Sequence, residues 1–130
     1  MKKQHKILIA SILVAVVITT SLLFFIFSNK GVTTEKDVSE VADYPTVAEL
    51  KDNLGTPSAV VDNKNDVLNE FNSIDKGNYA TDVDDYDSAK KELEDSDSIK
   101  LIKYKDRSTR DYFEYYFSDD TFVYSVYNLK

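Results

Sequence analysis

The sequence predicts an α+β protein, in which an N-terminal transmembrane helix precedes a small domain of two or three helices packed on a three-stranded antiparallel sheet. Three observations predict this fold class. Residues 7–27 form an uncharged apolar run, residues 46–95 repeat apolar side chains at helical spacing, and residues 99–129 are dense in β-branched and aromatic residues. Helices followed by a run of strands are typical of an α+β domain.

The apolar run, ILIASILVAVVITTSLLFFIF, is long enough to cross a bilayer. Its 21 residues would span roughly 30 Å as a helix, at about 1.5 Å per residue. A cleaved signal peptide has a shorter apolar region, of about 7–15 residues, followed by small residues. This run ends in FFIF and is followed by SNKG. We therefore interpret residues 7–27 as an uncleaved signal anchor, with a cleaved signal peptide as the alternative.

The charges beside this run predict its orientation. Lys2, Lys3 and Lys6 precede it, and only Lys30 follows it closely. The positive-inside rule keeps the more basic flank in the cytoplasm. We expect residues 1–6 to form a cytoplasmic basic tail and the C-terminal domain to be extracellular, which describes a single-pass protein of the cell membrane.

The remainder divides into a stalk and a domain. Residues 28–43 are polar and of mixed charge, which predicts a flexible stalk. The extracytoplasmic α+β domain is predicted at residues 44–130. Its first helix has the strongest signals: Thr46 and Glu49 form a capping box, and Gly55 follows the last apolar position.

The other elements follow from the periodicity of apolar residues. The predicted elements are helices at 46–54, 63–75 and 85–95, a short strand at 58–61, and strands at 99–105, 110–118 and 121–129. A tight turn is expected at residues 119–120, because Asp tolerates left-handed dihedral angles. Phe113 and Phe117 share the predicted core face of the second long strand. In the last strand the side chains expected on one face are Phe122, Tyr124 and Val126.

Composition excludes several classes of function. All 23 acidic residues but only 12 of the 16 basic residues follow residue 30, which gives this part a formal charge of −11. Such a charge repels nucleic acid, so we expect no nucleic-acid partner. Fourteen Lys against two Arg, with much Asn, Asp and Tyr, is typical of an AT-rich Gram-positive bacterium.

The residues needed for catalysis are scarce. The only histidine, His5, precedes the predicted membrane span, and the chain contains no cysteine. Sites that require Ser with His, Cys with His, or zinc are therefore excluded from the exported domain. We predict that the protein is not an enzyme and needs no cofactor.

An acidic run is a candidate for a metal site. Its members are Asp82, Asp84, Asp85 and Asp87. An EF-hand loop that started at Asp82 would need Gly at its sixth position and Glu at its twelfth, where this chain has Asp87 and Leu93. Two interpretations stay open: a loose divalent-cation site, and a solvated acidic loop that favours the start of the following helix.

Two segments resemble a known family. TVAELKDNLGTPSAV (46–60) resembles the helix with a following L-G-x-P-S element of SmpA/BamE-like envelope domains, whose fold is similar to that of β-lactamase-inhibitor proteins. YYFSDDTFVYSV (115–126) is similar to their closing hairpin, with Asp120 where Gly is usual. The resemblance implies a helical pair against an antiparallel sheet of three or four strands, and a non-catalytic envelope domain that contacts another protein. The chain lacks the lipid-carrying Cys of BamE-type proteins, so no binding residue is carried over.

The aromatic hairpin is the candidate partner-binding surface. Helices on one face of a three-stranded sheet would leave the other face open, and Tyr suits binding surfaces because it is apolar with a polar tip. The candidate residues are Tyr112, Tyr116 and Tyr127, or the opposite set. We predict a membrane-anchored interaction module of a bacterial cell envelope, which docks an envelope or secreted protein through its tyrosine-rich sheet. The alternative is an acidic divalent-cation-binding or cell-wall-associated domain.

Overall fold

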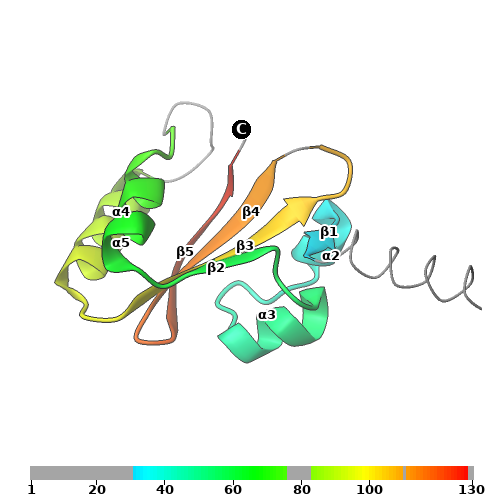
Figure 1. The fold of residues 1–130 in the computed structure, drawn as a ribbon, viewed down its shortest axis with the longest axis horizontal. Helices are drawn as coiled ribbons and strands as arrows, with labels where there is room; N and C mark the ends of the chain where they lie inside the picture. Colours follow the sequence, from blue (N-terminus) through cyan, green and yellow to red (C-terminus); the bar gives the residue numbers. More distant parts are fainter. Residues whose placement is uncertain (1–30, 76–82, 110, 129–130) are drawn as a thin grey trace, which may run out of the picture. The chain divides into compact units, whose positions relative to one another are not determined.

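The computed structural model describes residues 31–75, 83–109 and 111–128 (Figure 1). In this part of the chain, four helices pack on a five-stranded mixed sheet. The elements in chain order are β1 (Val32–Thr33), α2 (Glu35–Ser39), α3 (Val47–Leu54), β2 (Ala59–Val61), α4 (Lys64–Asn72), α5 (Val83–Asp95), β3 (Ile99–Asp106), β4 (Tyr112–Ser118) and β5 (Thr121–Asn128).

The prediction of a three-stranded antiparallel sheet is wrong, because two short strands extend the sheet. β3, β4 and β5 pair antiparallel as expected. The other side of β3 also pairs with β1 in parallel, through Lys105 and Asp106, and with β2 antiparallel, through residues 101–103. The short strand predicted at 58–61 is confirmed as β2. β1 has only two residues, too few to show an alternating pattern.

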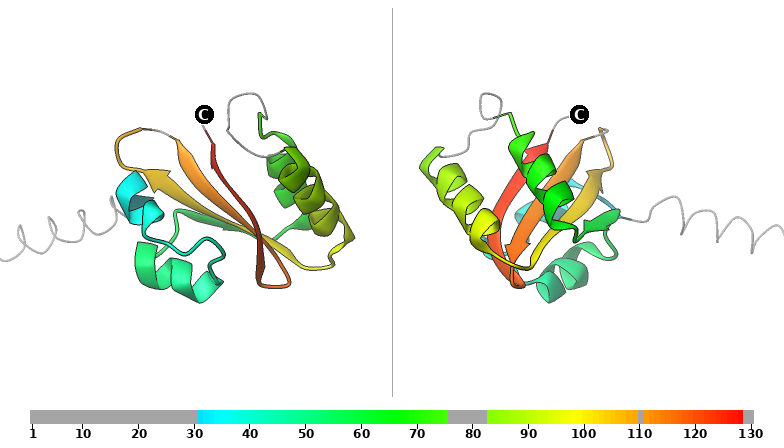
Figure 2. Two further views of the ribbon diagram at one scale, coloured as in Figure 1. Left: turned by 180° about the vertical axis from the view of Figure 1, so that it is seen from behind. Right: turned by 60° about the vertical axis from the view of Figure 1, so that its left-hand side comes forward.

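Helices cover both faces of the sheet, whereas the sequence analysis expected them on one face. Figure 2 shows α4 and α5 on one side of the sheet and α2 and α3 on the other. Phe71 of α4 and Tyr116 of β4 belong to the first core, and Leu50 of α3 and Phe117 of β4 belong to the second. β4 therefore buries side chains on both of its faces. The described part of the chain has four helices, whereas the sequence analysis expected two or three.

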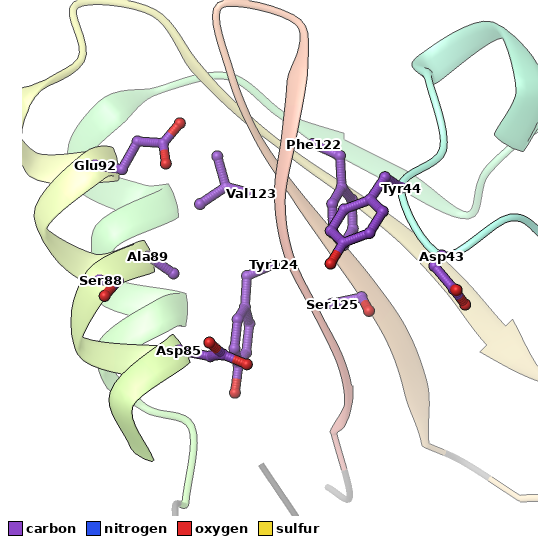
Figure 3. Close-up of a pocket in the computed structure, with 10 residues that line it drawn as sticks. All are labelled: Asp43, Tyr44, Asp85, Ser88, Ala89, Glu92, Phe122, Val123, Tyr124 and Ser125. Carbon is purple, nitrogen blue, oxygen red and sulfur yellow. The ribbon is translucent and has the colours of Figure 1, made fainter. Parts of the chain in front are cut away.

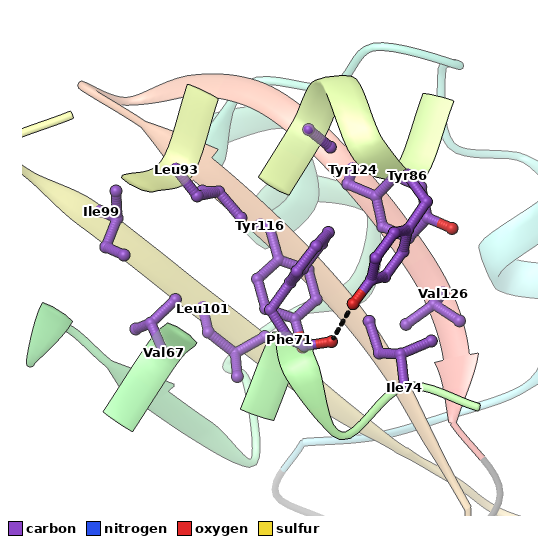
Figure 4. Packing of buried hydrophobic residues seen from close by; sticks show 11 residues of the cluster. Val67, Phe71, Ile74, Tyr86, Leu93, Ile99, Leu101, Tyr116, Tyr124 and Val126 are labelled. Atoms are coloured by element: carbon purple, nitrogen blue, oxygen red, sulfur yellow. Dashed lines mark hydrogen bonds between the residues drawn. The ribbon is translucent and has the colours of Figure 1, made fainter. Parts of the chain in front are cut away.

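The first core is built around Phe71, which is fully buried (Figure 4). Its ring stacks on Tyr86 of α5 at 4.6 Å between centroids and meets the edges of Tyr116 and Tyr124 at 5.0 and 5.4 Å. The Tyr86 hydroxyl donates to the carbonyl oxygen of Phe71 at 3.1 Å. One aromatic side chain thus joins α4, α5 and the two C-terminal strands.

The helix predicted at 46–54 is confirmed as α3. The Thr46 N–H donates to the Glu49 carboxylate at 2.8 Å, and the Glu49 N–H donates to Thr46 Oγ1 at 3.2 Å. The bond from the Thr46 N–H, followed by a bond that the Thr46 hydroxyl donates to the same carboxylate at 3.1 Å, lowers the pKa of Glu49. Gly55 ends the helix with a φ of 76°, a region that glycine adopts without strain. The Tyr104 hydroxyl donates to the Gly55 carbonyl at 2.9 Å and ties this end of α3 to β3.

Ordered structure begins before the predicted domain boundary at residue 44. Residues 32–39, within the expected stalk (28–43), form β1 and α2, and α2 has its own capping box of Thr34 and Asp37. The basic tail (1–6) and the apolar run (7–27) lie outside the described residues. In the ranges that the structure describes, no helix combines the length and apolar character that crossing a membrane requires.

A β-bulge changes which side chains of β5 share a face. The turn at residues 119–120 is confirmed, with φ of 48° and 62°. Tyr116 pairs with Tyr124 and Phe117 with Phe122, so Val123 is an extra residue between the two pairs. Phe122 therefore packs with the α3-side core, while Tyr124 and Val126 pack with the α5-side core. The expectation that all three point the same way is wrong for this reason.

We expect Phe71→Ala to destabilise the protein by about 3–5 kcal/mol, because it leaves a cavity among three aromatic rings. Urea unfolding of the full chain in detergent, followed by the near-ultraviolet circular dichroism of its tyrosines, would measure the change. Val60→Ala is the control: Val60 is half exposed and should cost less than about 1 kcal/mol. Equal losses for both variants would contradict this account of the core.

Candidate functional site

The structure does not bring the three candidate tyrosines onto one surface. Tyr116 is fully buried in the α5-side core. Tyr112 is half buried, and the Lys103 ammonium lies 5.0 Å from its ring centroid. Tyr127 pairs with Phe113 across the strands and stacks on its ring at 4.6 Å, on the opposite face of the sheet. Directly opposite residues of neighbouring strands share a face, so Tyr127 cannot join the other two.

Tyr116 belongs to a buried ionic cluster below α4. Glu114 is fully buried, and Lys103 lies directly opposite it on β3. The Lys103 ammonium is 3.2 Å from both Glu114 Oε1 and Glu70 Oε2. The Tyr116 hydroxyl donates to Glu114 Oε2 at 2.9 Å. Burial, with the Glu114 charge beside it, raises the pKa of Tyr116 far above its ordinary value.

The Tyr127 hydroxyl contacts both ends of the segment that connects β3 and β4. It donates to Asp106 Oδ2 at 2.8 Å and lies 3.2 Å from Asp111 Oδ2. Asp106 also accepts from the Ser108 N–H and hydroxyl, both at 2.8 Å. The Ser108 N–H bond in particular lowers the pKa of Asp106. The polar end of Tyr127 is engaged within the fold.

The acidic run does not assemble a cluster in the described part of the chain. Asp82 lies outside the described residues, and Asp84 belongs to the first turn of α5. Asp85 and Asp87 are exposed on α5. Within the described ranges, no three His, Cys, Asp or Glu side chains are placed to share a metal ion.

Part of the free edge of β5, at residues 122–125, lies in a groove of about 580 Å³ (Figure 3). Among the described strands, β5 pairs only with β4, whereas the far side of β3 is occupied by β1 and β2. The groove has α5 on one side and the segment before α3 on the other. The structure thus leaves the first half of one long strand edge at the bottom of a walled groove.

The first wall is one face of α5. Asp85, Ser88 and Glu92 follow each other at spacings of three and four residues, which places them along a single helical stripe. All three are exposed. The buried residues of the same helix, Tyr86, Ala89 and Leu93, belong to the core. The packing of α5 onto β5 therefore fixes which of its polar residues line the groove.

The second wall is formed by Asp43 and Tyr44. Tyr44 is 81% exposed and is the most exposed large hydrophobic residue recorded in the described part of the chain. Its ring meets the edge of Phe122 at 5.8 Å between centroids. The capping box of α3 starts two residues later, at Thr46. This short connection holds an exposed aromatic ring beside the start of β5.

The groove is acidic around an uncharged floor. Asp43, Asp85 and Glu92 line it from both walls, and the described lining residues include no Lys or Arg. β5 itself, TFVYSVYN, has no charged residue and no proline, although 30% of the whole chain is charged. Val123 and Ser125 lie on the floor between the walls. The arrangement can accept a chain segment.

Sequence reasoning missed this groove because its parts are distant in the chain. Residues 43–44, 85–92 and 122–125 meet only in the folded structure. One signal was available, namely the absence of charge from residues 121–128 in a strongly acidic chain. That signal predicts a strand but does not show that its edge is open.

Comparisons with known proteins give no relative: no family model, no curated protein and no solved structure matches the chain. The resemblance to SmpA/BamE-like domains therefore stays a prediction. The helix that carries the resemblance, α3, packs on the opposite face of the sheet from the α4–α5 pair.

We expect Lys103→Met to destabilise the protein by about 3–5 kcal/mol, because it leaves the Glu114 carboxylate buried without its cation. The double variant Lys103→Met/Glu114→Gln should recover much of this loss, since the amide oxygen still accepts from Tyr116 and no buried charge remains. Urea unfolding of both variants measures the difference. A double variant less stable than the single one would contradict the assignment of the cluster as an ion pair.

Proposed function

We propose that this protein is a non-catalytic interaction module of a bacterial cell envelope, which docks an envelope or secreted protein along the free edge of β5. The observation that carries the proposal is the walled groove over this edge. An open strand edge presents backbone N–H and C=O groups that a partner strand can pair with. Both faces of the tyrosine-rich sheet carry helices, so the edge replaces the sheet face as the docking surface.

The proposed location is the outer face of the cytoplasmic membrane. It is supported by the sequence alone, through the apolar run at residues 7–27 and the lysines that precede it. A module held there would meet proteins as they leave the cell or reside in the wall. The alternative of a divalent-cation site gains no support from the described residues, in which no three acidic side chains are placed to share a metal ion.

The location can be tested by labelling, because the chain has no cysteine. We expect Val60→Cys, at a half-exposed position, to react with a membrane-impermeant maleimide on intact cells stripped of their wall. A cysteine placed before the apolar run, Gln4→Cys, should react only after lysis. Labelling of residue 4 on intact cells, or of residue 60 only after lysis, would contradict the orientation.

The docking edge can be tested by photo-cross-linking in living cells. A photoreactive amino acid at Ser125, which is exposed on β5, should give one protein adduct of defined mass. The same amino acid at Val60, which is half exposed on β2 at the opposite edge of the sheet, is the matched control and should give none. Equal adducts at both positions, or none at Ser125, would refute docking at this edge.

A further inference from the structure

We infer that the segment docked in this groove is an extended, cationic strand, which adds to β5 as a further strand of the sheet with alternating basic and apolar side chains. The inference rests on the proposed function and names the chemistry of the partner. Three features support it: the backbone edge, the placement of the acidic walls, and the aromatic pair at one wall.

The backbone of β5 is suited to strand addition. In an antiparallel pair, every second residue directs its N–H and C=O groups away from the neighbouring strand. β5 is eight residues long and contains neither proline nor charge. The bulge at Val123 lies near the start of the strand, so the stretch beyond it pairs regularly. An added strand can therefore hydrogen-bond along most of this edge.

The wall formed by α5 selects basic side chains. Asp85 and Glu92 are two turns apart on one stripe of the helix, about 10 Å along its axis, and both line the groove. Side chains of an added strand alternate between the two walls. Lys or Arg residues two or four positions apart would all face α5, and their long side chains reach both carboxylates. Their aliphatic stems can pack on Val123, which is half buried on the same floor.

The opposite wall selects an apolar or aromatic side chain. Tyr44 and Phe122 present an edge-to-face ring pair there, and Tyr44 is largely exposed. A side chain that covers these rings removes apolar surface from water. Asp43 beside them adds negative charge to the rim of this wall. The intervening positions of the strand are therefore apolar, which gives a basic–apolar alternation.

Charge argues against a second copy of this chain as the occupant. Edge-to-edge pairing of two copies would bring together the carboxylates of Asp43, Asp85 and Glu92 from both, on domains of formal charge −11 each. Like charges placed opposite each other are destabilising. The same carboxylates that would repel a second copy would attract a cationic strand.

The test uses the full chain in detergent micelles and fluorescent eight-residue peptides, with binding followed by anisotropy. We expect a peptide of alternating Lys and Phe to bind, and its affinity to fall with added salt. The same peptide with Glu for Lys should not bind. N-methylation of every second residue keeps the charge of the peptide but blocks strand pairing along one of its edges. Two such peptides, methylated on the odd or on the even residues, should differ: only one of them should lose binding.

Variants of the protein distinguish the effect of the carboxylates that line the groove from the effect of the overall negative charge. Asp85→Asn/Glu92→Gln should weaken binding of the Lys peptide about five- to tenfold, as expected for two exposed charge pairs. Asp95→Asn/Asp97→Asn removes the same charge from exposed positions that do not line the groove, and should leave binding unchanged. Equal weakening by both pairs, or equal binding of Lys and Glu peptides, would overturn the inference. The cross-link at residue 125 would then decide separately whether a protein still docks there.

Discussion

The structure depends on the burial of the central strands on both faces of the sheet. β3 and β4 contribute alternate side chains to two cores, one beneath α4 and α5 and the other beneath α3. A strand buried on both sides has no face left for a partner, so aromatic residues that would suit a binding surface serve as core. Tyr115, for example, is buried, which raises its pKa to about 12. Only the edges of such a sheet can contact another chain.

Burial on both faces also explains why Glu114 and Lys103 form an ion pair. They occupy directly opposite positions in the middle of the sheet, below α4. A buried charge is tolerated only with a close partner and satisfied hydrogen bonds, and here Tyr116 and Glu70 supply further contacts. The tyrosine hydroxyl is thereby engaged in orienting a core carboxylate.

Local signals predicted local structure well, and long-range packing less well. The capping box of Thr46 and Glu49 and the turn at residues 119–120 depend on neighbours within four residues, and both were predicted from the sequence. The faces of β4 could not be distinguished, because both alternating sets of its side chains are largely aromatic. The bulge at Val123 reversed the expected face of Phe122, since one extra residue shifts an alternation of period two. β1 was missed because pairing with β3, rather than its own sequence, makes it a strand.

The groove could not be predicted from the sequence, because it also depends on long-range packing. The position of its charged residues bears on its function. Proteins usually protect an exposed edge strand with charges or proline on the strand itself, which also prevents productive pairing. Here β5 carries neither, and the charges stand on α5 and at Asp43 instead. Protection placed beside the strand repels identical acidic copies while the backbone edge stays available. A strand edge flanked by carboxylates in this way can distinguish a basic partner from an acidic one. This property suits a docking site better than it suits a strand that only needs protection from aggregation.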